Sequence, residues 1–293
     1  MHRSMGSLRC GLASLAQLAF ILAVVATARA DDPRGGYIEL PTGKLWVLDT
    51  GGAGEPVVLL HPRTGNSAIW ENQIPYFVAA GFRVIAPDKP GAGRSALAPD
   101  WKQVPYAETI DALVDHLSLT QFTLVGAAEG GYFALDYAAW KPGRIQKLVL
   151  ASSGLGVQVD EEGRAFRHNA AIPGFSKLPP EVRELSPTYR GLNPAGVRRW
   201  LEIEEHGTPE NAVRALLRTP NTVEKLAALR MPVLVIAGDV DLTTPSGAIR
   251  LWAKHLAHHE FKLITEAGHA VMWEQPQAFN EAVLSFIKSG QTP

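Results

Sequence analysis

A tight turn in the middle of the chain has the glycine spacing of a reactive site. The apolar run 122–125 predicts a buried strand, and the helical pattern 130–140 follows almost at once. Gly126 and Gly130 stand two residues before and two residues after Ala128, which lets a strand and a helix approach closely around a strained turn residue. A nucleophile at the centre of such a turn could attack a carbonyl group. Alanine offers no nucleophile, proton or lone pair, so a covalent acyl intermediate at Ala128 is excluded.

The segment FTLVGAAEGG at 122–131 resembles the nucleophile elbow of α/β-hydrolases, G-x-S-x-G, with Ala128 in the place of the serine. Four further segments resemble that family in the same order: HP at 61–62, RVIAPDKPGAGRS at 83–95, VLVIAGDVDLTTP at 233–245 and EAGHAVMWEQP at 266–276. In the family they form the oxyanion loop, the strand and turn before the helix that leads to the elbow, the strand of the catalytic acid and the loop of the catalytic histidine. The overall pattern is most similar to capped members such as 3-oxoadipate enol-lactonase-like and carbon–carbon-bond hydrolases.

The resemblance implies roles for four residues besides Ala128. His269 falls where the family has its base, and Asp241, three residues after Gly238, falls where the family has the acid that orients this base. Asp239 competes for the role of the acid, but a turn position is expected for it.

The family's oxyanion hole uses two backbone N–H groups, and here they belong to Glu129 and Arg63. Pro62 has no N–H, so Arg63 must supply the second donor. The side chains of Arg63 and Glu129 are also candidates for contact with substrate. The alternative is that they only form an ion pair with each other.

Substitutes for the missing serine are scarce. Ser152 and Ser153 end the strand after the elbow, but they are not on the elbow itself, so we do not expect either to act as nucleophile. The one cysteine, Cys10, lies in the N-terminal segment. No histidine pair or carboxylate cluster has metal-ligand spacing and no phosphate loop appears, so neither a metal nor another cofactor is expected.

The elements that must position these residues alternate between short apolar runs and longer amphipathic runs, which predicts an α/β fold with a mostly parallel central sheet and helices on both faces. Strands are expected at 44–49, 56–61, 83–87, 122–125, 147–151, 233–237 and 261–264, and helices at 106–119, 130–140, 246–256 and 276–288. No convincing strand occurs in 157–230, where Asn193-Pro194 and Thr208-Pro209 have the form of helix starts and Gly207 that of a helix stop. We therefore expect an α/β-hydrolase core at 31–156 and 231–293 with an inserted helical cap at 157–230.

The first 30 residues have the order of charges and apolar residues that a secretory signal peptide has. Arg3 and Arg9 precede an apolar run at 18–25, and the small-residue pattern Ala28-Arg29-Ala30 follows it. The run is short for a membrane anchor, so we expect a secreted or periplasmic protein cleaved after Ala30. Cleavage removes three arginines and no acids, and leaves 25 basic and 29 acidic residues. This balance favours neither nucleic acid nor a membrane as a partner of the mature form.

These observations predict an enzyme that acts on a small carbonyl-bearing substrate, with His269 and Asp241 as an acid–base dyad and no covalent intermediate. The reaction could be hydrolysis of an ester or lactone, carbon–carbon cleavage or a lyase-type proton transfer. Two alternatives remain: a non-catalytic ligand-binding protein on a hydrolase scaffold, and a serine hydrolase inactivated by replacement of its serine with alanine. The sequence indicates no particular oligomeric state.

Overall fold

A single sheet of eight strands organises the computed structural model, which describes residues 1–2, 34–95, 103–157, 160–209 and 215–290. Apart from its first two residues, the expected leader at 1–30 lies outside the described residues. The strands run in the order β1-β2-β4-β3-β5-β6-β7-β8. Their bounds are β1 Arg34–Leu40, β2 Gly43–Asp49, β3 Pro56–Leu60, β4 Arg83–Pro87, β5 Phe122–Ala127, β6 Ile145–Ala151, β7 Val233–Gly238 and β8 His259–Ile264.

All neighbouring pairs from β4 to β8 are parallel, while β1 and β2 form an antiparallel hairpin at one edge. Every residue of β5 and of β7 is buried, because helices cover both faces of these central strands. Their continuous apolar sequences follow from this double burial. The expected mostly parallel α/β sheet is confirmed.

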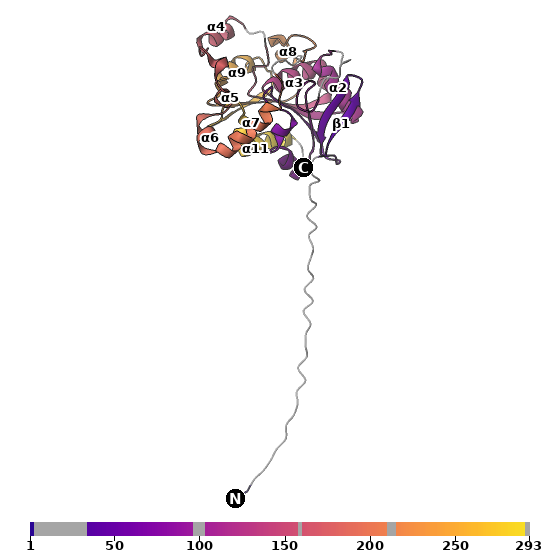
Figure 1. Ribbon diagram of the computed structural model, residues 1–293. Helices are drawn as coiled ribbons and strands as arrows, with labels where there is room; N and C mark the ends of the chain where they lie inside the picture. The colour runs from indigo at the N-terminus through magenta and orange to yellow at the C-terminus, as the bar shows by residue number, and fades with distance from the viewer. Residues whose placement is uncertain (3–33, 96–102, 158–159, 210–214, 291–293) are drawn as a thin grey trace.

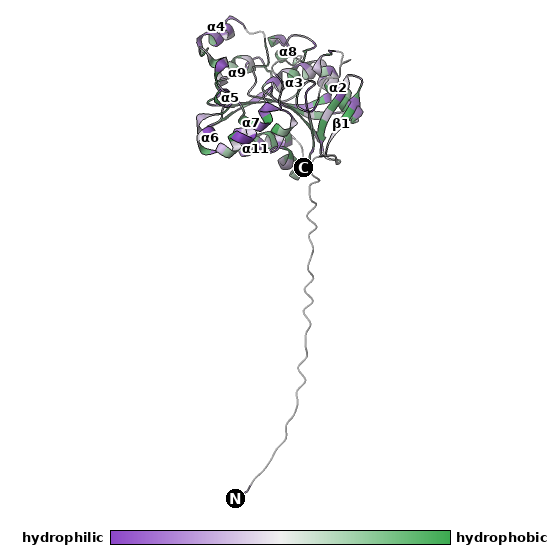
Figure 2. Cartoon of the chain, in the orientation of Figure 1, coloured by the Kyte–Doolittle hydropathy of each residue, from purple (hydrophilic) through white to green (hydrophobic). Residues whose placement is uncertain are grey.

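Two layers of helices sandwich the sheet (Figure 1). One core cluster joins one face of the sheet to α2, α3, α8 and α9, and the other joins the opposite face to α1, α10 and α11. The bounds are α1 Ile74–Ala79, α2 Tyr106–His116, α3 Glu129–Trp140, α8 Val223–Ala228, α9 Ser246–Ala253, α10 Val271–Glu274 and α11 Pro276–Lys288. The visible helices of both layers carry hydrophilic residues, drawn purple, among the hydrophobic ones (Figure 2).

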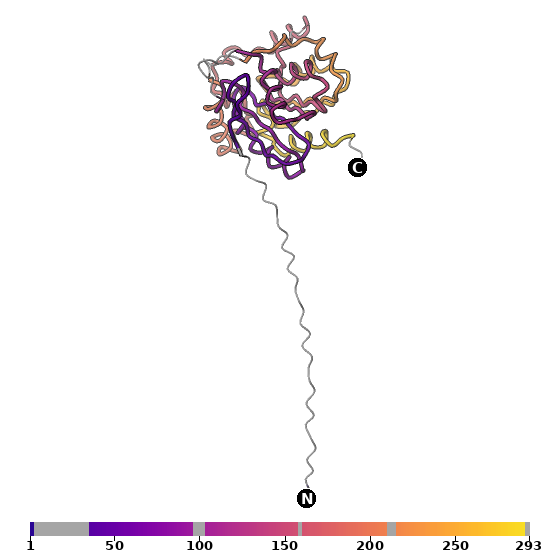
Figure 3. Tube along the Cα trace, turned by 90° about the vertical axis from the view of Figure 1, so that its right-hand side faces the viewer, coloured from indigo at the N-terminus to yellow at the C-terminus, as the bar shows by residue number. Residues whose placement is uncertain are grey.

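Helix α1, in the early part of the chain, packs against the C-terminal helix α11, drawn yellow in Figure 3. The buried side chain of Gln73, just before α1, donates to the Met272 carbonyl at 2.9 Å and to Asn280 Oδ1 on α11 at 3.1 Å. These bonds satisfy polar groups that would otherwise be costly to bury.

Between β6 and β7 the described residues form helices and no strand, as the pattern at 157–230 predicts. They are α4 Glu161–Asn169, α5 Pro180–Glu184, α6 Pro187–Leu192 and α7 Pro194–Glu205, followed by α8. The Asn193 side chain caps α7 by accepting from the Gly196 N–H at 2.9 Å, as its sequence suggests. The helix expected to start at Thr208-Pro209 falls on 210–214, outside the described residues.

Two expectations need correction. Helix α8 belongs to the layer that packs on the sheet, since Leu226 is part of the core cluster with α3 and α9, so the expected cap segment ends in a helix of the core layer. Strand β1 was not expected, because its sequence RGGYIEL is rich in glycine and β-propensity is weak in such a run. It forms because it pairs with β2 along its full length.

Candidate active site

The carboxyl ends of the parallel strands bring the expected site residues to one edge of the sheet. Arg63 follows β3, Ala128 follows β5, Asp241 follows β7 and His269 follows β8. Ala128 and His269 line the same cavity together with Arg63 and Glu129. Crevices at this edge of an open α/β sheet are where such folds bind ligands. The structure thus brings all the candidate residues together, while their catalytic roles stay predictions.

The turn at Ala128 retains the strained geometry of a nucleophile elbow. Ala128 has φ 48° and ψ −115°, a conformation that costs of order 1–3 kcal/mol for a residue other than glycine. A Cβ on Gly126 would lie 2.6 Å from the Gly130 carbonyl oxygen, and a Cβ on Gly130 would lie 2.2 Å from that of Leu60. Both glycines are therefore required by the close approach of strand and helix.

Two neighbouring serines at the end of β6 have different environments. The Ser153 hydroxyl donates to the Ala128 carbonyl at 2.6 Å and accepts from the Leu155 N–H at 3.1 Å, so it supports the elbow and is not available as a nucleophile. Ser152 lines the cavity and has φ 45°. Its hydroxyl is buried without a hydrogen-bond partner in the part of the chain that the structure describes.

Asp241 and His269 form a buried hydrogen bond. The imidazole Nδ1 of His269 lies 2.8 Å from Asp241 Oδ2. His269 is 6% exposed and Asp241 is 3% exposed. The N–H groups of Thr243 and Thr244 donate to the other carboxylate oxygen at 2.9 and 2.7 Å, which orients Asp241. Asp239, the competing acid, is exposed and accepts from the Ala267 N–H at 3.3 Å, as expected of a turn residue.

A second carboxylate faces the other nitrogen of His269. Glu184 Oε2, from the C-terminal residue of α5, lies 3.8 Å from His269 Nε2, and Glu184 is only 5% exposed. Burial tends to lower the pKa of His269, but the charges of Asp241 and Glu184 and the hydrogen bond to Asp241 outweigh it and raise the pKa to about 9. Both carboxylates therefore favour the protonated imidazole.

Glu129 and Arg63 do not form the ion pair that the sequence left open. Glu129 pairs instead with Lys89, a buried residue in the loop after β4, and that alternative is wrong. The Lys89 ammonium also lies 5.7 Å from the centre of the Phe133 ring. Burial lowers the pKa of Lys89, and the attraction of Glu129 offsets part of this effect. Glu129 is the first residue of α3, so this ion pair fixes its side chain at the N-terminal end of that helix.

His61 is a structural residue of the oxyanion loop. Its Nδ1 lies 2.7 Å from the Pro62 carbonyl oxygen, and the Lys89 N–H lies 2.9 Å from its Nε2. Nδ1 must therefore carry the proton and Nε2 must accept. Burial lowers the pKa of His61, which keeps the ring neutral and this pair of bonds intact. The two bonds join the loop after β3 to the loop after β4.

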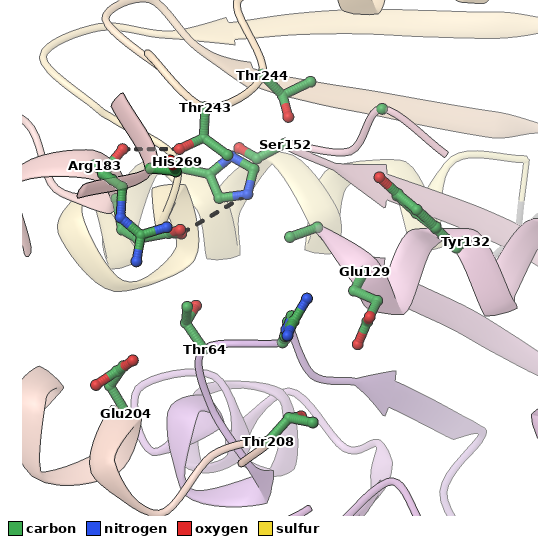
Figure 4. A pocket seen from close by; sticks show the side chains of 15 residues that line it. Thr64, Glu129, Tyr132, Ser152, Arg183, Glu204, Thr208, Thr243, Thr244 and His269 are labelled. Carbon is green, nitrogen blue, oxygen red and sulfur yellow. Dashed lines mark hydrogen bonds and ion pairs between the residues drawn. The ribbon is translucent and has the colours of Figure 1, made fainter. Parts of the chain in front are cut away.

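The cavity above Ala128 has a volume of about 770 Å³ and a largely polar lining. Figure 4 shows Glu129 and Tyr132 on one side of the space, His269 and Arg183 on the opposite side, and Glu204 and Thr208 below it. A second cavity of about 570 Å³ shares Tyr132 and Thr244 with it. Its lining includes the apolar side chains of Phe166, Ile172, Leu251 and Trp252. The two cavities together offer a polar region at the dyad and an apolar region under α4.

Among the described residues, no group of three or more His, Cys, Asp or Glu side chains is arranged to hold a metal ion. Within the same ranges, every helix is too short or too polar to cross a membrane.

The fold and the position of the site define the class of protein. Residues 55–226 match the family model of the alpha/beta hydrolase fold, and the chain belongs to that family. It is similar to a 2-hydroxy-6-oxononadienedioate/2-hydroxy-6-oxononatrienedioate hydrolase of Paraburkholderia phymatum, with 29% identity over 260 residues that cover 82% of this chain and 89% of the relative. The relatives of this kind are hydrolases, so the resemblance to carbon–carbon-bond hydrolases is confirmed.

Solved structures give the same fold. A thermophilic esterase from Thermogutta terrifontis matches 88% of this chain and all of its own chain, with a TM-score of 0.72 and 24% identity. The enol-lactonase from Burkholderia xenovorans LB400 matches 87% of this chain and all of its own, with a TM-score of 0.71 and 21% identity. At these identities the likeness concerns the fold alone.

Glu184 is the site residue that sequence reasoning missed. It lies in the expected cap, in the run Pro180-Glu-Val-Arg-Glu184, where an acid at a short helix end is ordinarily solvated. No spacing relates it to His269, because the two residues meet only through the docking of the cap on the core.

Proposed function

We propose that this protein is an enzyme of the α/β-hydrolase family that acts on a small carbonyl-bearing substrate, an ester, a lactone or a ketone with a cleavable carbon–carbon bond, without a covalent intermediate. His269, oriented by Asp241, exchanges a proton with water or substrate. The N–H groups of Glu129 and Arg63 stabilise the oxyanion or enolate. The volume that a serine hydroxyl would fill at Ala128 is left to substrate or water.

The observation that carries this proposal is the buried Nδ1–Oδ2 contact of 2.8 Å between His269 and Asp241 beside a strained elbow. A protein that only binds a ligand has no need of a buried, charged dyad, because burying these groups costs free energy. The printed activity of the relative from Paraburkholderia phymatum, hydrolysis of a hydroxy-oxo-dienedioate or -trienedioate, supports the substrate class.

The experiment is to restore the nucleophile. Wild type should resist covalent labelling by a fluorophosphonate, which needs a serine activated by a base. Ala128→Ser should gain both labelling and hydrolysis of a small activated ester. The rates of both should increase toward pH 9, because His269 loses its extra proton over this range. The hydroxyl is small, and we expect a change in stability within about 1 kcal/mol.

Ala128→Ser combined with His269→Ala is the control and should lose the gain. Labelling of wild type at Ser152 or Ser153 would show that the site is assigned wrongly. If Ala128→Ser folds normally and gains neither labelling nor ester hydrolysis, the site is not arranged for acyl transfer.

The second candidate is a ligand-binding protein on a hydrolase scaffold, and Ala128 itself is the observation that favours it. The same cavity would then bind a carbonyl compound without converting it. Incubation of wild type with candidate esters, lactones and vinylogous diketones, followed by mass spectrometry, separates the two: turnover supports the enzyme, and saturable binding of an unchanged compound supports the binder.

A further inference from the structure

Glu184 sits in the part of the cap that is tied to the histidine loop. Its backbone carbonyl accepts from the N–H groups of both His269 and Ala270, at 2.8 and 3.1 Å. Two residues further on, Ser186 N–H donates to Glu274 Oε2 at 2.7 Å, and its hydroxyl donates to the Glu266 carbonyl at 3.1 Å. The backbone of 184–186 is therefore held in one position relative to the imidazole.

The glycine before the histidine makes this approach feasible. A Cβ on Gly268 would lie 2.8 Å from the Glu184 carbonyl oxygen and 2.8 Å from the Ser186 nitrogen. Any other residue at 268 would push the cap segment away. The Thr64 side chain, in the loop after β3, tends to lower the pKa of the Glu184 carboxyl.

We propose that Glu184 is a positioning residue that faces Nε2 of His269, the nitrogen that a serine hydroxyl approaches in a complete triad, and that it holds the imidazole in its doubly protonated form. With Asp241 at Nδ1 and Glu184 at Nε2, each ring nitrogen faces a carboxylate, and both contacts are favourable only while the ring carries both protons.

The charged groups around the ring act in the same direction. Asp241 from the loop after β7, Glu184 from α5 and Glu274 from α10 all favour the cation and raise the pKa of His269. For Glu184, burial raises the pKa and the charge of His269 opposes that rise. Arg183, beside Glu184, acts on the glutamate and favours its ionised form.

The consequence for the reaction rests on the proposed function. His269 can abstract a proton only after it has lost the Nε2 proton that the Glu184 carboxylate stabilises. The rate of a base-catalysed step should therefore rise from neutral pH toward about 9. Replacing the charge of Glu184 should move this rise to lower pH. A residue with only a structural role would lower the rate without moving the profile.

The titration of the His269 ring tests the proposal without any need for turnover. Protein with isotope-labelled histidine is titrated by NMR from pH 5 to 10.5, and the signal missing from His269→Gln identifies the resonance. Wild type should titrate near pH 9. Glu184→Gln keeps the size of the side chain and one hydrogen-bonding oxygen. In this variant the midpoint of the His269 titration should fall by at least about one pH unit, which is a tenfold loss of proton affinity.

Glu204→Gln is the matched control, since Glu204 lines the same cavity but has no ion-pair contact with His269 among the residues described. It should leave the titration within a few tenths of a unit. Glu184→Asp keeps the charge at greater distance and should give an intermediate midpoint, which serves if Glu184→Gln does not fold. A wild-type midpoint near 6.5, or equal shifts in the two Gln variants, would overturn the proposal. If the titrations behave as expected and no substrate is turned over, only the proposed function fails.

Discussion

At the scale of single residues, the site differs from a complete triad in two coupled ways. Ala128 removes the group that would share a proton with Nε2 of His269, and Glu184 brings a carboxylate to 3.8 Å from the same nitrogen. A serine hydroxyl leaves the imidazole neutral at rest and ready to accept a proton. A carboxylate facing the same nitrogen favours the cation instead, so in our proposal His269 carries a proton on each ring nitrogen before the reaction begins.

Because the pKa of His269 is raised, the free energy of unfolding should decrease as the pH becomes alkaline. Its pKa is about 9 in the folded protein and about 6.5 in the unfolded protein. Between these two pH values the folded state keeps the extra proton and the unfolded state loses it. The stabilisation is complete below pH 6.5 and is lost as pH rises through 9, with an upper limit of about 3 kcal/mol. Urea unfolding of wild type and His269→Gln between pH 6 and 10 measures it.

The difference in the free energy of unfolding between wild type and His269→Gln should shrink as pH rises through 9. His116→Gln, at the exposed end of α2, is the control. Its free energy of unfolding should differ from that of wild type by the same amount at every pH. A constant difference for His269→Gln across the range would contradict the assigned protonation.

At the scale of elements, the loop after β8 and the end of α5 behave as one unit. The loop supplies His269, the helix end supplies Glu184, and the backbone bonds between them fix both. The elbow between β5 and α3 is a second unit, which Ser153 supports from β6. Gly268 and Gly130 each lie where another backbone segment leaves no room for a side chain.

Gly268→Ala should separate the cap from the histidine loop. The new methyl group would meet the backbone at Glu184 and Ser186, so we expect a loss of about 1–3 kcal/mol and a lower midpoint for the His269 titration. Thermal unfolding and the NMR titration measure the two effects. Gly191→Ala, in cap helix α6 where a Cβ meets nothing within 4 Å, should leave both unchanged or slightly stabilise the helix.

Gly268→Ala with wild-type stability and titration would mean that the cap does not hold its position in solution. A similar loss in Gly191→Ala would point to general weakness of the cap and not to the contact at His269.

At the scale of the whole molecule, a sheet covered on both faces carries a cavity under helices that come from one insertion between β6 and β7. The polar part of this cavity lies over the dyad, and the apolar part lies under α4 and against α9. A substrate with a carbonyl group near one end and an apolar body would fit this division. In the proposed function, the segment between β6 and β7 contributes to the site through Glu184, which lies 3.8 Å from His269.

The expected leader remains a prediction. We expect protein isolated from the native host to begin at Asp31, because the small-residue pattern ends at Ala30 and the charges and apolar run stand in the order of a secretory signal. Mass spectrometry of the intact protein from culture medium or periplasm measures the mature N-terminus. Replacing Ala28 and Ala30 with bulky residues should block cleavage. Recovery of the uncleaved wild-type chain in the cytoplasm would contradict export.

The sheet apart from β1 could be predicted from the amino-acid sequence, and the resemblance to α/β-hydrolases implied the elbow and the dyad. Short apolar runs separated by amphipathic helices predict a parallel sheet, and residues that follow its strands must then meet at one edge. The resemblance to α/β-hydrolases implies that Asp241, His269 and Ala128 are the residues that form the site there. These features depend on local pattern and order along the chain.

Which charges face one another across that edge depends on the tertiary structure and could not be predicted from the sequence. Glu129 pairs with Lys89 and not with Arg63, and Glu184 reaches His269 from 85 positions away in the chain. Such contacts depend on how the cap and the loops dock on the sheet, and no periodicity along the chain encodes that docking. The electrostatic state of the histidine, and with it the chemistry that the site can perform, therefore follows from packing between distant segments.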